Sequence, residues 1–62
     1  MSLPITRLRL YREKHFLNLV ELGAKADVSI GTISNAENGK KISLGCIKKL
    51  AKALRVKPSD LL

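Results

Sequence analysis

The sequence predicts an all-α fold, a compact bundle of five helices, and three observations lead to that prediction. Apolar residues recur every three or four positions through most of the chain, which is the spacing of helices buried on one side. No segment alternates apolar and polar residues as a half-buried strand does. Proline and Gly39 lie at the ends of the periodic segments, whereas Gly23, Gly31 and Gly45 lie inside them.

We expect the five helices at residues 5–14, 19–26, 29–37, 44–54 and 59–62, the last as a short closing turn. Three of them start at a residue whose side chain can cap a helix, namely Asn18, Ser29 and Ser43. Glu21 stands three positions after Asn18 and completes a capping pair with it. The third helix is expected to stop at Asn38-Gly39, a sequence typical of helix ends.

Residues 19–38 read LVELGAKADVSIGTISNAEN and fit two short helices joined by a tight turn. Small or apolar residues mark the faces on which the two helices would meet: Leu22, Gly23, Ala26, Ile33 and Ala36. Gly23 leaves room for the second helix to cross close by. Asp27 lies where the chain must reverse, and aspartate tolerates a left-handed backbone better than most residues.

The length of 62 residues has room for one small domain, so residues 1–62 are expected to form a single unit. Residues 1–4 are expected to be disordered or to derive from cloning. The formal net charge of +7 predicts an anionic partner, with nucleic acid and an acidic membrane surface as the first candidates. No apolar run approaches the ~20 residues that span a bilayer, and no secretory signal is visible at the start.

The sequence holds one cysteine, Cys46, and one histidine, His15. A single cysteine excludes an internal disulfide, and one histidine makes a metal cage implausible. No set of nucleophile, base and orienting group can be assembled from these residues and the five acids. We therefore expect no enzyme activity, no cofactor and no small-molecule substrate. For Cys46 a buried small side chain is favoured over a redox switch.

An ordered set of residues runs through most of the chain: Leu8, Arg12, Leu17-Asn18, Leu22-Gly23, Val28-Ser29, Thr32-Ile33-Ser34, Glu37-Asn38-Gly39-Lys40, Leu50-Ala51-Lys52-Ala53-Leu54 and Leu61-Leu62. In this set, residues 8–62 resemble the helix-turn-helix family of phage Cro and lambda-type repressors. The resemblance implies that the third helix enters the major groove of double-stranded DNA and that the second crosses the backbone above it. It also implies a cytoplasmic homodimer on a palindromic operator, acting as a repressor of transcription, with a bacterial, phage or plasmid origin.

The resemblance points to five candidate base contacts on the third helix: Asn35, Thr32, Ile30, Gly31 and Ser34. Asn35 can pair with an adenine edge through two hydrogen bonds, and the alternative is a solvated polar residue. Thr32 can contact a base edge or a phosphate, or bond back into its own helix. Ile30 and Gly31 depart from the polar residues usual in the family. Ile30 suits a thymine methyl group, or else the core or an interface, while Gly31 suits close backbone approach or is neutral.

Six candidate phosphate contacts flank that helix: Asn18, Asn38, Lys40, Lys41, Ser43 and Arg12. Leu19 departs from the glutamine common in the family, so backbone N–H groups after the Asn18 cap would have to bind the phosphate. Arg12 and Glu37 match a pair that is salt-bridged in family members and would brace the recognition helix. We expect this pair to be exposed, and therefore worth only ~0–1 kcal/mol.

Two other functions compete with DNA binding. A protein-interaction module or an antitoxin-type partner would use the same fold, and the apolar Ile30 favours it. A membrane-active basic peptide is suggested by the amphipathic segment 44–57, but the apolar stripe of that segment is already needed to close the bundle.

Overall fold

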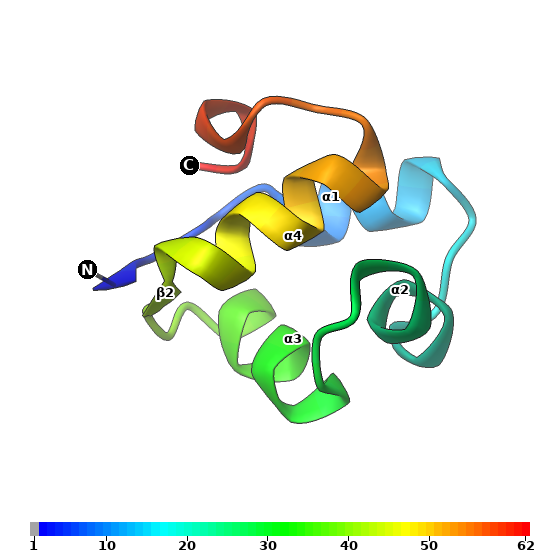
Figure 1. Ribbon diagram of the computed structural model, residues 1–62, viewed down its shortest axis with the longest axis horizontal. Coiled ribbons are helices and arrows are strands. Elements are labelled where there is room, and N and C mark those ends of the chain that lie inside the picture. Colours follow the sequence, from blue (N-terminus) through cyan, green and yellow to red (C-terminus); the bar gives the residue numbers. More distant parts are fainter. Residues whose placement is uncertain (1) are drawn as a thin grey trace.

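The computed structural model describes residues 2–62 and consists of helices packed around one core (Figure 1). The elements follow in the order β1 (Ser2–Leu3), α1 (Leu8–Lys14), α2 (Leu19–Ala26), α3 (Ile30–Glu37), β2 (Ile42–Ser43), α4 (Leu44–Leu54) and η1 (Pro58–Leu61). The prediction of five α-helices is not confirmed, because the last element is a 3-10 helix of four residues. A segment of that length is too short to propagate the hydrogen bonds of an α-helix.

The three predicted caps are confirmed by their hydrogen bonds. The Oδ1 atom of Asn18 accepts from the N–H of Glu21 at 2.7 Å, and Glu21 Oε1 accepts from the N–H of Asn18 at 3.0 Å. Ser29 Oγ accepts from the N–H of Thr32 at 3.2 Å, and Ser43 Oγ from the N–H of Cys46 at 3.3 Å. Helix α1 lacks a side-chain cap at Arg7 and begins three residues later than predicted, at Leu8.

Each of the four α-helices is followed by a residue with a left-handed backbone: Phe16, Asp27, Gly39 and Arg55. In every case the next N–H donates to a carbonyl five residues back, as Leu17 does to Arg12 at 3.2 Å. The left-handed turn predicted at Asp27 is confirmed by its φ of 56°. Phe16 is unusual, because an aromatic residue at a φ of 55° carries steric strain and its side chain is 92% exposed.

The core is a single cluster to which every helix contributes: Ile5, Leu8, Leu22, Ala26, Val28, Ile33, Ala36, Ile42, Ile47, Leu50, Ala51, Ala53, Leu54 and Leu61. Helix α4 lies across the centre of the bundle, with α3 and α2 on one side and η1 on the other (Figure 1). Within residues 2–62, no helix has the length and apolar character needed to cross a membrane.

A short antiparallel sheet joins the start of the chain to the start of α4. Ser2 pairs with Ser43, and Leu3 pairs with Ile42. The expectation of disorder in residues 1–4 is therefore wrong for Ser2 and Leu3, while Met1 lies outside the described residues. Two-residue strands show no alternating pattern, so periodicity does not reveal them. Their position is set by the neighbouring Ile5 and Ile42, which are both buried in the core.

Gly23 makes the close crossing of α2 and α3 possible. A Cβ atom at this position would lie 2.8 Å from the carbonyl oxygen of Val28. Real Cβ atoms do not approach a backbone oxygen so closely, so a larger residue would push the turn away from α2. The turn 27–29 and the start of α3 are therefore placed by the absence of a side chain at residue 23.

We predict that Gly23→Ala lowers the free energy of unfolding by about 1–3 kcal/mol, because the added methyl group overlaps the backbone of Val28. Equilibrium urea denaturation measures this change. Gly45→Ala is the matched control, since a Cβ at residue 45 of α4 meets nothing within 4 Å. That variant should gain ~0.5–1 kcal/mol from helix propensity. Equal or greater stability of Gly23→Ala than of the unchanged protein would contradict the close crossing.

Relief of the strain at residue 16 should stabilise the protein. We predict that Phe16→Asn raises the free energy of unfolding by about 1 kcal/mol, because asparagine adopts the left-handed conformation readily. The corresponding rise in Tm is about 4–8 °C in a thermal melt. Phe16→Ala keeps the Cβ and its strain, so it should show no comparable gain. A lower Tm for Phe16→Asn would mean that the aromatic ring stabilises the fold.

Candidate nucleic-acid interface

Helix α3 buries one face and exposes the other, as the sequence predicted. Ile33 and Ala36 are completely buried against the core. Ile30, Gly31 and Asn35 are exposed, whereas Thr32 and Ser34 are half-buried. The hydroxyl of Thr32 lies 2.8 Å from Ser29 Oγ, so the local bond that competes with DNA contact is present.

A hollow of about 290 Å³ lies beside this exposed face, between α3 and the start of α4. It brings together five of the predicted contact residues, namely Thr32, Asn35, Lys40, Lys41 and Ser43, with Ile42 and Cys46 completing its lining. Two lysines and no carboxylate are among the residues that line it. The hollow therefore joins a helix face suited to base edges with a basic, polar wall suited to phosphates.

The start of α4 supplies the backbone donors of this wall. Ser43 ends β2 and caps α4 at once, so its strand pairing with Ser2 holds the helix N-terminus in place. Gly45 is exposed, and the space where its Cβ would lie is open. N–H groups at a helix N-terminus carry partial positive charge and are suited to phosphate oxygens, and the exposed Lys40 and Lys41 add two full positive charges beside them.

Asn18 lies at the other predicted phosphate site, the start of α2. Its N–H and its Oδ1 both bond to Glu21 in the capping box. The carboxylate of Glu21 thus occupies part of the helix N-terminus and carries the same charge as a phosphate. Leu19 and Val20 contribute only their backbone N–H groups there, so we expect this to be the weaker of the two phosphate sites.

Arg12 joins α1 to the end of α3 through Glu37. Its Nε donates to Glu37 Oε2 at 2.6 Å, its Nη2 to Glu37 Oε1 at 3.1 Å, and its Nη1 to the carbonyl of Leu17 at 2.9 Å. The predicted salt bridge is therefore present, but the side chains are only 14% and 12% exposed, so the expectation that the pair is exposed is wrong. The hydrogen bond to Glu37 raises the pKa of Arg12 despite the opposing effect of burial. With three of its five N–H donors engaged inside the protein, Arg12 acts as a brace between α1 and α3.

The remaining predicted contacts lie outside the hollow. Ile30, Gly31 and Ser34 are on α3 but do not line it. Asn38 follows α3 as its exposed C-terminal cap residue. Cys46 lines the hollow, although the sequence favoured a buried position for it. The sequence could have indicated this position, because Cys46 follows the Ser43 cap by three residues and therefore lies in the first turn of α4.

Within residues 2–62, the acidic side chains of the protein leave the lysines beside α3 unpaired. All five carboxylates have partners inside the protein: Glu13 with Arg9, Glu21 with the N–H of Asn18, Asp27 with Lys49, Glu37 with Arg12, and Asp60 with the N–H of Lys57. None of these partners is Lys40 or Lys41. The two lysines beside α3 therefore keep their charge available for an anion.

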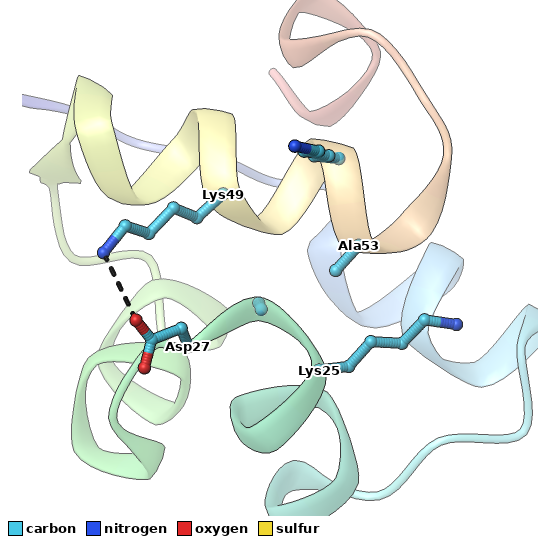
Figure 2. A pocket seen from close by; sticks show the side chains of 6 residues that line it. Lys25, Asp27, Lys49 and Ala53 are labelled. Carbon is cyan, nitrogen blue, oxygen red and sulfur yellow. Dashed lines mark ion pairs between the residues drawn. The ribbon is translucent and has the colours of Figure 1, made fainter.

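A second, larger hollow of about 430 Å³ lies between the end of α2 and α4 (Figure 2). Lys25, Lys49 and Lys52 surround it, with Ala26 and Ala53 also in the lining. Asp27 is part of the same lining, and its carboxylate lies 4.0 Å from Lys49 Nζ. It shares no residue with the hollow beside α3 and contains none of the predicted contacts, so its size does not make it the functional site.

The brace between α1 and α3 can be tested by stability. We predict that Glu37→Gln lowers the free energy of unfolding by about 2 kcal/mol, because it leaves a largely buried guanidinium without its anion. Glu13→Gln is the matched control, since the Arg9–Glu13 pair is 3.7 Å long and its side chains are 70% and 59% exposed. That change should stay below ~0.5 kcal/mol in urea denaturation. Equal effects of the two substitutions would show that the brace has no special weight.

Comparison with known proteins agrees with this geometry. A family model described as Helix-turn-helix matches residues 8–61. The DNA complex of SinR, a master regulator for biofilm formation, has a TM-score of 0.83 at 28% identity and covers 89% of this chain and 90% of that chain. The restriction-modification controller protein C.AhdI from Aeromonas hydrophila has a TM-score of 0.84 at 32% identity, with coverages of 90% and 86%.

The clp gene regulator ClgR from C. glutamicum has a TM-score of 0.75 at 31% identity and covers 87% of this chain and 71% of that chain. Among curated protein sequences, none matches. The family match spans every element from α1 to η1, including both helices of the turn and the brace. The chain belongs to the helix-turn-helix family.

Proposed function

We propose that the protein binds double-stranded DNA in a sequence-specific manner and regulates transcription as a repressor. Helix α3 lies in the major groove, and Asn35 reads a base edge there. Lys40, Lys41 and the N-terminus of α4 hold the adjacent phosphates, with Asn38 alongside. The N-terminus of α2 holds a second phosphate through backbone N–H groups.

The observation that carries this proposal is the hollow beside α3. It collects two base-reading candidates, Thr32 and Asn35, on the same wall as Lys40, Lys41 and Ser43. A helix face next to an anion-binding edge is the arrangement that major-groove recognition requires. The net charge of +7 adds a long-range attraction to a polyanion.

The charge and base contacts predict separable effects of two substitutions. Lys40→Ala should weaken binding to all duplexes alike and reduce the salt dependence of log Kd by ~0.9 for each phosphate that is no longer neutralised. Asn35→Ala should instead reduce discrimination at one base pair by ~1–3 kcal/mol. Fluorescence anisotropy on duplexes selected from a random pool, over a series of salt concentrations, measures both.

Lys48→Ala is the control for charge, because Lys48 is an exposed residue of α4 outside the hollow. It should change the affinity much less than Lys40→Ala. An unchanged base preference in Asn35→Ala would remove the base-reading role of Asn35. Failure of the protein to bind any duplex at micromolar concentration would overturn the proposed function.

We further propose that a homodimer binds a palindromic operator in the cytoplasm. One domain reads only a short half-site, so specific binding is expected to need two domains about one turn of DNA apart. Leu62 is 49% exposed and the nearby Val56 is half-buried, which leaves apolar surface for a second copy. Leu61 is fully buried and closes the core of its own chain.

The dimer predicts a symmetric preferred sequence and two chains for each duplex. Native mass spectrometry of the complex gives the stoichiometry, and the selected sequences give the symmetry. Leu62→Lys should favour the monomer and weaken binding to the two-fold sequence more than to a single half-site. An asymmetric preferred sequence bound by one chain would contradict the homodimer.

A protein partner is the second candidate function, and the exposed apolar side chains favour it. Phe16, Val20 and Ile30 are 92%, 62% and 45% exposed. Such residues suit a protein surface as well as a DNA groove. A gel shift at moderate salt separates the two functions, because a pure interaction module binds no duplex.

A further inference from the structure

We propose that α3 reads the 5-methyl group of thymine, with Ile30 as the side chain that contacts it. The preferred DNA sequence then carries a T·A pair at the start of α3. This inference rests on the proposed function and adds the chemical group on DNA that is recognised.

The first turn of α3 offers DNA an apolar surface. Ile30 has no polar atom in its side chain, and it is 45% exposed although α3 is packed on the core. Gly31 adds no side chain at all. The hydroxyl of Thr32 is the only polar side-chain group of this turn, and it is already bonded to Ser29 Oγ at 2.8 Å.

An apolar side chain limits what can be read in the major groove. Base edges there present hydrogen-bond donors and acceptors, and the methyl group of thymine is the apolar exception. Placing Ile30 against an acceptor or a donor would remove water from that group without replacing its hydrogen bond, which is unfavourable. Placing it against the thymine methyl buries apolar surface on both sides.

The side chain of Ile30 also has little conformational freedom to lose. A Cβ at residue 23 would lie 3.7 Å from Cγ1 of Ile30, so Ile30 extends over the space that Gly23 leaves open on α2. A β-branched side chain has few rotamers in a helix. Little side-chain entropy is therefore lost when DNA covers the exposed part of Ile30.

Gly31 allows DNA to approach that surface. A Cβ at residue 31 would meet nothing within 4 Å, so the space beside Ile30 belongs to the solvent and is open to a groove. The missing side chain costs α3 helix propensity without any packing requirement inside the protein. A close approach of DNA gives this position a function that the free protein does not explain.

The test removes and restores the methyl group on the DNA, with the protein unchanged. After selection of the preferred duplex, each thymine is replaced in turn by deoxyuridine, which lacks only the methyl. We expect a loss of about fourfold in affinity at one position in each half-site, as for one methyl-sized group withdrawn from an apolar contact. A second series places cytosine or 5-methylcytosine at that position, and methylation should restore about fourfold.

The protein variants assign the effect to a side chain. Ile30→Ala should reduce the ratio between the affinities for the thymine and deoxyuridine duplexes, because most of the contacting side chain is removed. Lys41→Ala is the matched comparison: it should weaken both duplexes and leave their ratio unchanged. Circular dichroism of both variants checks that α3 is folded.

Three outcomes would count against the proposal in different ways. Tight, selective binding that tolerates deoxyuridine at every position would overturn methyl reading and leave the proposed function intact. A methyl effect of unchanged size in Ile30→Ala would overturn the role of Ile30. No binding to any duplex would instead remove the proposed function on which the inference rests.

Discussion

Helices α2 and α3 meet where a Cβ on residue 23 would be only 2.8 Å from the carbonyl oxygen of Val28. This contact between a helix and a turn fixes the direction in which α3 leaves Asp27. The direction decides that Ile33 and Ala36 face the core and that Ile30, Gly31 and Asn35 face the solvent. The presentation of the exposed face therefore follows from a missing methyl group.

The far end of α3 is fixed by a different kind of interaction. The two hydrogen bonds between Arg12 and Glu37 tie it to α1, and the residues that follow lead into β2. Lys40 and Lys41 thus lie between two fixed points. The end of α3 before them is bonded to Arg12, and the strand β2 after them is paired with β1. The carboxylates of the protein are bonded to other groups. Both the position and the charge of Lys40 and Lys41 therefore favour an anion beside α3.

Local signals predicted much of the structure. The caps at Asn18, Ser29 and Ser43 and the turn at Asp27 follow from the chemistry of a few neighbouring residues, and the sequence shows those residues directly. The left-handed backbone at Phe16 and the pairing of Ser2 with Ser43 depend on tertiary packing, which residue preferences do not reveal. The burial of Arg12 could not be predicted either, because it depends on how α1 and α3 pack against each other. The hollow beside α3 could be predicted only in part, because Cys46 and Ile42 join it through the path of the chain.

The ends of the described chain are interlocked. Leu61 is fully buried, its carbonyl accepts from the N–H of Arg7 at 3.1 Å, and η1 packs along α4. During synthesis the core therefore lacks one of its buried residues until residue 61 has left the ribosomal exit tunnel. Up to that point the nascent chain leaves exposed the surface of α4 against which η1 packs. A small domain of this kind is expected to fold late and all at once, rather than progressively from its N-terminus.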